Sequence, residues 1–456
     1  MKTYLFLPFL LIFGSSFGQQ KPAFKSLRYD DDFSHLKLDS VRNDYEKLKF
    51  MPLTESGNTY ISLGGDVRFQ YFNIRNEDWG DTSDDKDGHT LSRFLVHADF
   101  HTDDLFRLFV QLQGSNANGR INPNPVEDNP LDLHQAFFDI NFKSGTEGKL
   151  TFRAGRQELS YGSQRLIAVR ELPNSRSAFD GARMLLNIRN LQSDIFYTHP
   201  VANRKGILDD AFNDDTKLWG SYTVIQDIPF LENIDVYYLG FWKRKATFDD
   251  ALGKERRHSF GTRIWKNKGN WNYDFEGVYQ FGKIQEKSIL AWTISSNTSY
   301  QFDGMKFKPT VGLKTEIISG NKTYGDATIE TFNPLFPKGA YFGLAALIGP
   351  SNLIDVHPSV DLEINPRLNI TLDYDAFWRY SASDGIYAPN QQLIYTGKAS
   401  SEKFIGTQWG TEIAYQYSSM LFFKLQGTWF QSGTFLKDSG AGKDILLGGI
   451  TTQFKF

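Results

Sequence analysis

The chain closes on the stretch DILLGGITTQFKF, residues 444–456, and this stretch indicates the fold. Its second half alternates between apolar residues (Ile450, Phe454 and Phe456) and polar residues (Thr451, Gln453 and Lys455). A period of two is typical of a β-strand with one apolar and one polar face. The last residues of a soluble domain usually fray, whereas in a bilayer the last strand must pair with the first. We therefore expect residues 444–456 to close a transmembrane β-barrel.

The composition supports a barrel with an apolar outside and a polar inside. The 456 residues include 39 Phe and 21 Tyr, yet 23% of the residues are charged. A soluble globule rarely needs both, but an outer-membrane barrel uses aromatic girdles outside and polar groups in its lumen. The balanced net charge of -3 gives no indication of a nucleic-acid partner. The absence of Cys excludes disulfides and thiolate metal sites.

The first twenty residues, MKTYLFLPFLLIFGSSFGQQ, have the features of a secretory signal peptide. Lys2 precedes an apolar run, Tyr4–Phe13, that is too short to span a bilayer as a helix, and small residues suited to cleavage follow it. We expect residues 1–19 to be a signal peptide. Residues 20–59 are then a periplasmic lead-in, with one short helix within residues 40–53.

From residue 60 to the end of the chain the dominant period is two. In WNYDFEGVYQF, residues 271–281, aromatic side chains share one face, and polar or acidic side chains share the other. Such runs are long for globular strands and suit tilted strands that cross a bilayer. We predict about eighteen strands, at residues 61–72, 90–101, 104–114, 134–143, 149–158, 180–190, 193–200, 216–226, 233–243, 257–266, 270–282, 288–302, 306–318, 355–364, 367–379, 404–417, 420–433 and 444–456.

Long polar connections alternate with short turns along this series of strands. An outer-membrane barrel has this layout, with long extracellular loops and short periplasmic turns, whereas a β-sandwich or a propeller does not predict it. The sequence therefore predicts an all-β fold, a transmembrane antiparallel β-barrel, over residues 60–456. The connection 319–354 is too long to be unstructured. It either folds inward as a constriction or forms an external cap.

Charges that face the lumen determine what such a barrel conducts. The densest cluster is RAGRQELSYGSQRLIAVRELPNSRSAFDGARM, residues 153–184. Strand parity points Arg153 and Arg183 inward. Arg156 has the opposite parity, and we expect a bulge at Gly155 to turn it inward. The same parity test gives further inward candidates, which are Arg68, Arg93, Lys314, Glu316, Asp373 and Arg379.

Guanidinium groups suit an anionic solute because they are always charged and present paired donors that match carboxylates. A ring of them raises the local concentration of an anion, and interspersed acids keep binding weak enough for release. The alternative is that these arginines pair with lumenal Asp and Glu and only brace the wall. For the whole cluster we expect a role in solute passage, because packing alone does not require so many arginines.

The sequence gives little indication of catalysis or metal binding. The eight His residues lack metal-ligand spacing, and no nucleophile elbow is present. We therefore expect no catalytic residue, no metal and no cofactor. The acidic runs DTSDDKDG (81–88) and LDDAFNDD (208–215) could bind calcium or lipopolysaccharide, although such runs are more often only solvated.

Several segments resemble the alginate export family of outer-membrane barrels. They are GGDVRFQYF (64–72), AGRQELSYGSQRL (154–166), RSAFDGARM (176–184) and the stretches 341–379 and 405–436. The family pattern of GRQ followed by RSFDG is present with Ala178 inserted. The resemblance implies an eighteen-stranded barrel whose arginine-rich constriction passes an anionic uronate polymer. Residue by residue, it implies pore-lining roles for Arg68, Arg153, Arg156, Arg176, Asp180 and Arg183.

Together these observations predict a porin in the outer membrane of a Gram-negative cell. We expect passive diffusion of an anionic polysaccharide or oligosaccharide, such as an alginate-like uronate, or of small organic anions. The alternatives are a general or other-substrate anion-selective porin, a barrel enzyme and a soluble periplasmic glycan-binding protein. Further expected partners are outer-membrane lipids, lipopolysaccharide and the barrel assembly machinery, which would recognise Phe456. Passive flow follows the gradient, so export and uptake both stay open.

Overall fold

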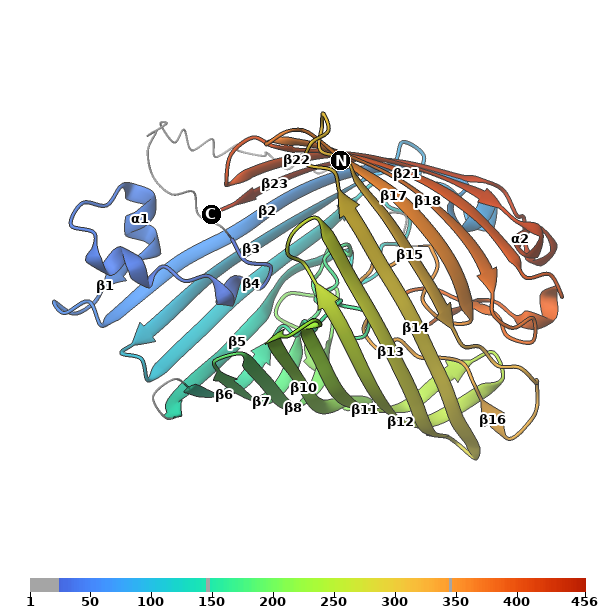
Figure 1. Ribbon diagram of the computed structural model, residues 1–456, viewed down its shortest axis with the longest axis horizontal. Helices are drawn as coiled ribbons and strands as arrows, with labels where there is room; N and C mark the ends of the chain where they lie inside the picture. The colour runs from blue at the N-terminus through green and yellow to red at the C-terminus, as the bar shows by residue number, and fades with distance from the viewer. Residues whose placement is uncertain (1–23, 145–147, 344–346) are drawn as a thin grey trace.

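The β-sheet of this protein closes on itself. The computed structural model describes residues 24–144, 148–343 and 347–456, so the predicted signal peptide lies outside the described residues. Eighteen long strands each pair antiparallel with the next along the chain, and β23 pairs with β2 (Figure 1). The predicted all-β barrel is therefore confirmed. The strands are β2 (Thr59–Arg75), β3 (His89–Thr102), β4 (Phe106–Asn118), β5 (Asn129–Ser144), β6 (Gly148–Gln157), β7 (Phe179–Ile188), β8 (Leu191–Ala202), β10 (Thr216–Ile228), β11 (Glu232–Phe248), β12 (Ala251–Lys266), β13 (Trp271–Ile284), β14 (Lys287–Gln301), β15 (Thr310–Ile318), β17 (Leu353–Asn365), β18 (Leu368–Arg379), β21 (Phe404–Gln416), β22 (Leu421–Ser432) and β23 (Ile445–Lys455).

Shorter elements lie at the two ends of the barrel (Figure 1). The end where β2 begins and β23 ends is called the terminal rim, and the opposite end is called the loop rim. Before β2 the chain forms η1 (Arg28–Asp30), η2 (Ser34–Leu38), α1 (Asp44–Lys49) and β1 (Met51–Pro52). The connections at the loop rim carry η3 (Glu77–Gly80), β9 (Ala211–Phe212), β16 (Thr328–Ile329), β19 (Ile386–Tyr387), β20 (Leu393–Tyr395), η4 (Gly397–Ala399) and α2 (Thr434–Ser439). Within the described ranges, no helix is long and apolar enough to cross a membrane.

Side chains along each strand project alternately outward and inward. On β2, Phe69 is 45% exposed while its neighbour Arg68 is only 4% exposed. On β14, Ile294 is 61% exposed while Thr293 is 1% exposed. Large apolar side chains therefore cover the outside, as a barrel in hydrocarbon requires. Charged and polar side chains line much of the inside, where a buried apolar cluster that includes Leu218, Leu239 and Phe377 also packs.

The closing strand is held in register along its length. Residues 446–455 of β23 pair with residues 66–75 of β2 without a shift. Beyond this ladder, the Phe456 N–H donates to the Gly65 carbonyl at 3.0 Å, and the Gly65 N–H donates to the Phe456 carbonyl at 2.8 Å. A Cβ atom on residue 65 would lie 2.5 Å from the Phe456 ring. Glycine at this position therefore gives the ring the space to pack against the barrel wall.

The longest connection folds into the barrel. Within residues 319–352, β16 pairs in parallel with β14, and Phe336 forms a β-bridge with Ile167 of another connection. Tyr341 and Phe342 are buried. Of the two alternatives for this connection, the inward constriction is therefore correct. Its apolar run at 341–349 forms no strand in the residues of that run that are described.

Residues 24–58, called the N-terminal segment, fold against the terminal rim. The predicted short helix is present as α1, which begins with a capping box between Asn43 and Glu46. At the end of α1, the ammonium group of Lys49 donates to the Leu63 carbonyl on β2 at 2.6 Å. Desolvation by burial lowers the pKa of Lys49 to about 7. The contact attaches the segment to the first strand of the barrel.

The outward face of β14 offers a test of the membrane-spanning arrangement. Ile294→Arg places a charge near the middle of the strand on the outer face, so we expect it to destabilise the barrel by about 2–4 kcal/mol. Tyr300→Arg, on the same face near the terminal rim, should cost about 0–1 kcal/mol. Denaturant unfolding in lipid bilayers measures both values. Equal costs for the two variants would contradict the arrangement.

Candidate functional site

Two connections from the loop rim enter the lumen and meet there. They are residues 158–178, between β6 and β7, and residues 319–352, between β15 and β17, and together they are called the constriction. The Ala168 N–H donates to the Phe336 carbonyl, and the Phe336 N–H donates to the Leu166 carbonyl, both at 2.9 Å. The constriction is thus joined through the backbones of both connections.

Glu171 is the common acceptor for three arginines of the constriction and the wall. Its carboxylate contacts Arg93, Arg176 at 2.8 Å and Arg68 at 3.5 Å. Desolvation acts to raise the pKa of Glu171, but these guanidinium groups outweigh it and hold the pKa below its usual range. The Glu171 side chain is still 48% exposed, so solvent reaches this network at its carboxylate.

Arg176 also connects the constriction to the wall through Glu158. Its guanidinium contacts the Glu158 carboxylate at 2.7 Å and 3.0 Å, and the His134 ring lies 2.7 Å from the same carboxylate. Glu158 and Glu171 outweigh desolvation and raise the pKa of Arg176. Arg176 therefore keeps its charge in this buried position.

The arginines on β6 and β7 face inward and bind carboxylates on neighbouring strands. Arg153 makes a two-pronged contact with Asp139, at 2.7 Å and 2.8 Å. Arg183 pairs with Asp194, with one hydrogen bond of 3.0 Å. Both guanidinium groups are almost fully buried. In this structure both groups bind carboxylates of the barrel wall. This is the bracing role that the sequence analysis gave as the alternative to contact with a solute.

A second charged group lies on the wall formed by β13 and β15. Arg165 of the constriction donates to Glu276 at 3.0 Å and to the Tyr341 hydroxyl at 2.6 Å, and it contacts Glu316. The Lys314 ammonium donates to the Tyr341 carbonyl at 3.2 Å. Lys314 and Glu316, both predicted to face inward, are thus brought together by the constriction.

Two predicted pore-lining residues lie on the outer face. The register of β6 with β5 and β7 has no bulge, so the prediction that Gly155 turns Arg156 inward is wrong. Arg156 pairs at 2.8 Å with Asp180, which lies opposite His199 on β8. His199 shares its face of β8 with Tyr197, which is half-exposed on the outside of the barrel. Asp180 therefore also points away from the lumen.

Arg379 and Asp373 face inward but have different surroundings. Arg379 is 0% exposed, and its guanidinium donates to carbonyls of the 380–403 connection, among them Ser400 at 2.6 Å. These bonds attach the 380–403 connection to β18. Asp373 is partly exposed and lies 3.7 Å from His357.

The N-terminal segment reaches into the lumen from the terminal rim. The Tyr29 hydroxyl donates to the Glu158 carbonyl at 2.9 Å, and the Arg153 guanidinium lies 4.4 Å from the centre of the Tyr29 ring. Arg28 donates to the carbonyls of Gly65 and Phe456 at 2.7 Å and 3.0 Å. These contacts join the segment both to the constriction and to the closing strand.

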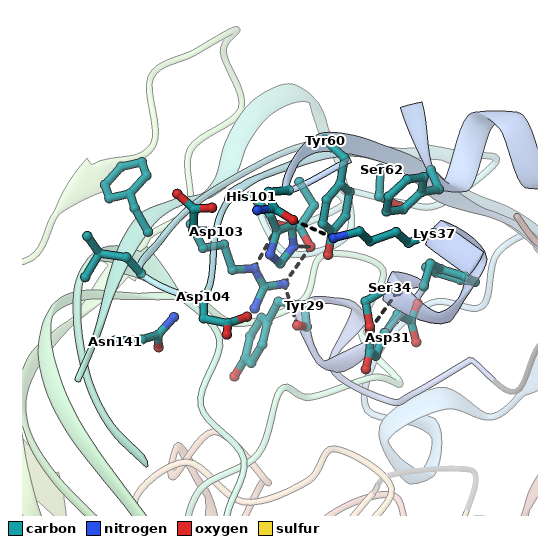
Figure 2. A pocket seen from close by; sticks show the side chains of 18 of the residues that line it. Tyr29, Asp31, Ser34, Lys37, Tyr60, Ser62, His101, Asp103, Asp104 and Asn141 are labelled. Atoms are coloured by element: carbon teal, nitrogen blue, oxygen red, sulfur yellow. Dashed lines mark hydrogen bonds and ion pairs between the residues drawn. The ribbon is translucent and has the colours of Figure 1, made fainter. Parts of the chain in front are cut away.

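A cavity of about 1010 Å³ lies between the N-terminal segment and the wall. Figure 2 shows Tyr29, Asp31, Ser34 and Lys37 of the segment around it, together with His101, Asp103, Asp104 and Asn141 of the wall. Its lining includes acidic, basic and aromatic side chains, so charge alone selects no class of solute at this end of the barrel.

Strand parity alone could not find several residues that shape the lumen. Glu171, Arg165 and Tyr341 lie in connections, where a period of two does not apply, and Tyr29 lies in the lead-in. The available signal for the first two was the density of charge in residues 153–184. No comparable signal marked Tyr29.

The alginate export family matches residues 59–444 of this chain. No curated protein matches.

Solved outer-membrane porins share the fold. They include OccD3 (OpdP) of Pseudomonas aeruginosa, which is 14% identical with a TM-score of 0.58. The match covers 90% of this chain and 93% of that one. A BenF-like porin from Pseudomonas fluorescens Pf-5 is 10% identical with a TM-score of 0.58, over 87% of this chain and 98% of that one. OccK2 (OpdF) of Pseudomonas aeruginosa, solved in complex with glucuronate, is 9% identical with a TM-score of 0.55, over 87% and 96%.

The Glu171 network makes a prediction about stability and pH. Glu171→Gln removes the charge that three guanidinium groups share, so we expect the free energy of unfolding at pH 7 to fall by about 1–2 kcal/mol. Because the pKa of Glu171 is lowered in the folded state, its contribution is complete above the unfolded-state pKa and is lost as the pH falls toward the folded-state pKa. The difference from wild type should therefore shrink below about pH 4.

Denaturant titrations of both proteins in bilayers at several pH values measure this difference. Glu363→Gln is the control, since its partner Lys308 is half-exposed and such surface pairs contribute about 0–1 kcal/mol. A Glu171→Gln protein as stable as wild type at pH 7 would show that the network carries no net stabilisation.

Proposed function

This chain belongs to the alginate export family of outer-membrane channels, and we propose that it conducts an anionic, uronate-containing oligosaccharide or polysaccharide by passive diffusion. The solute path runs through the lumen and past the constriction. The guanidinium groups of Arg153, Arg176 and Arg183, with those of Arg68 and Arg93, provide the positive charge along it. Arg156 and Asp180, on the outer face, have no part in this path.

The observation that carries the proposal is the way lumenal arginines hold the N-terminal segment. Arg176 donates to the Ser26 carbonyl at 3.0 Å, and Arg107 donates to the Tyr29 carbonyl at 2.5 Å. Carbonyl and carboxylate oxygens are both acceptors for guanidinium, and the charged acceptor binds more strongly. The backbone oxygens of this segment therefore occupy positions that suit the carboxylates of a passing uronate.

A similar fold is known with a uronate bound. OccK2 was solved in complex with glucuronate, a sugar that carries one carboxylate. At 9% identity this likeness covers the fold alone, so it supports a uronate as a reasonable solute and assigns no residue. Small organic anions and other anionic sugars are the alternative solutes on the same scaffold.

The N-terminal segment sets the open state of the channel. The Tyr29 ring packs edge-on against Phe109 and Phe137, and the Arg153 guanidinium lies over both Tyr29 and Phe137. Passage of a polymer along this wall requires the segment to move away from the lumen. Residues 24–58 then act as a periplasmic gate.

The other proposed partners lie outside the lumen. Outer-membrane lipids and lipopolysaccharide surround the barrel, and the barrel assembly machinery recognises Phe456.

Substitution of lumenal arginines should weaken the interaction with the solute. We expect Arg153→Gln and Arg176→Gln each to raise the concentration of an alginate oligomer that blocks the channel current by roughly tenfold to hundredfold. A hydrogen bond to a charged group contributes about 1.5–3 kcal/mol. Current recordings in planar bilayers with increasing amounts of oligomer measure the change.

Arg156→Gln is the matched control, because it removes the same group from the outer face of the same strand. Arg153→Lys tests whether charge without the two-pronged geometry suffices. If Arg156→Gln changes block as much as Arg153→Gln does, the effect comes from the barrel wall and the assignment of the path is wrong.

Releasing the N-terminal segment should open the channel. The double variant Arg28→Ala and Tyr29→Ala removes the contacts to the closing strand and to Glu158, and we expect a higher single-channel conductance than wild type. Leu38→Ala, an exposed position in the same segment, should leave the conductance unchanged. Equal conductance of wild type and the double variant would contradict the gate.

A further inference from the structure

A cluster of ligand-type side chains lies on β17 and β18, outside the charge networks of the constriction. Asp355 and His357 are two residues apart on β17 and so share its inward face. In the register that pairs Val356 with Ala376, Asp375 of β18 lies beside His357. One ligand atom from each of Asp355, His357 and Asp375 lies within 4.8 Å of the other two.

Asp355 is the unusual member of this cluster. Its side chain is 0% exposed, and neither carboxylate oxygen has a hydrogen-bond partner. A buried carboxylate without partners costs several kcal/mol unless a cation or a proton compensates it. Of the nearby cations, Arg165 binds Glu276 and Lys314 donates to the Tyr341 carbonyl, and neither donates a hydrogen bond to Asp355.

The other two side chains are close together without a satisfactory hydrogen bond. The Nδ1 atom of His357 and the Oδ1 atom of Asp375 lie 2.7 Å apart, yet neither atom has an aligned hydrogen-bond partner. The second oxygen of Asp375 accepts from Gln408 at 3.5 Å. The Nε2 atom of His357 faces Asp373 at 3.7 Å. Gln408 and Asp373 therefore lie next to the two ligand side chains, in the position that outer groups take in metal sites.

The charges around the cluster also favour a divalent cation. Asp355, Asp373 and Asp375 carry three negative charges when ionised, and the nearby Lys314 carries one positive charge, which leaves a net charge of about -2. Lys314 itself lies over the rings of Tyr341 and Phe342, each centre at 4.7 Å. His357 is partly exposed, which gives an ion a way in from the lumen.

We propose that Asp355, His357 and Asp375 bind one divalent transition-metal ion, with Zn²⁺ as the best match. Two carboxylates and one imidazole are ligands that Zn²⁺ accepts, and an imidazole disfavours Ca²⁺ and Mg²⁺, which prefer oxygen. Three protein ligands leave a coordination position for water or for a solute carboxylate. The ion joins β17 to β18 beside the constriction.

A second group of acids shows why this cluster differs. Asp132, Asp209 and Asp210 also come within 4.8 Å of one another. Asp132 accepts from the N–H groups of Asp209 and Asp210, both at 3.0 Å, and Asp210 accepts from Asn129 at 3.0 Å. Hydrogen bonds already use the oxygens of Asp132 and Asp210, whereas Oδ1 of Asp209 accepts none. Asp209 and Asp210 are only partly buried, so this group does not require a cation as Asp355 does, and Asp209 is a control position.

The test uses the full-length protein in detergent after treatment with a chelator, with Zn²⁺ and Co²⁺ as probes. We expect calorimetry to show one Zn²⁺ bound per chain and Co²⁺ to give visible absorption typical of nitrogen and oxygen ligands. Asp355→Asn and His357→Gln should each weaken Zn²⁺ binding at least roughly tenfold. Asp209→Asn should bind Zn²⁺ like wild type.

The chain contains no Cys, so Asp355→Cys introduces a single thiol at the proposed site. Binding of Co²⁺ by this thiol would appear as a new absorption band, whereas the other variants only weaken binding. A thiolate-to-cobalt charge-transfer band in this variant would place the ion on residue 355. Absence of Zn²⁺ binding by wild type would overturn the proposal and leave a protonated carboxyl or water as the compensation. Binding that survives His357→Gln or gives no thiolate band with Asp355→Cys would overturn it as well.

Discussion

The whole structure depends on one constraint, which is that every backbone N–H and C=O group in hydrocarbon needs a partner within the protein. The sheet meets this constraint by closing β23 onto β2 over ten consecutive pairs, from residues 66–75 to residues 446–455. Closure fixes the register of every strand, and a period of two then assigns each side chain to lipid or to lumen. The fold therefore decides where charge can be placed before any particular solute is considered.

The lumen holds many charged side chains that are largely buried from solvent. The inward-facing arginines of the strands have a carboxylate or a set of carbonyls nearby, such as Asp139 for Arg153 and Asp194 for Arg183. Buried pairs of this kind contribute little net stability, but breaking one leaves an uncompensated charge. The arrangement keeps guanidinium groups fixed in the lumen, where two of them already hold carbonyls of the N-terminal segment.

The strands were predictable from the sequence because their signal is local. Alternation placed Arg68 and Arg153 inward and Phe69 outward, and the structure agrees. Arg156 failed because a bulge was invoked to override parity, and the unbroken register of β6 left parity in force. Glu171 and Tyr29 could not be placed, since a connection that folds inward and a lead-in that enters the lumen depend on contacts far apart in sequence. The Asp355 cluster was missed for a related reason: its ligands come from two strands, and only one of them is a histidine.

The most direct test of the central claim is the reversal potential of wild-type channels in a planar bilayer under a salt gradient. Guanidinium groups fixed along the proposed path should make anions more permeant than cations, so the potential should shift toward the equilibrium potential of the anion. The shift should shrink at high ionic strength. A reversal potential shifted toward the equilibrium potential of the cation would contradict the account. The absence of ion conduction, even after the N-terminal segment is released, would contradict it as well.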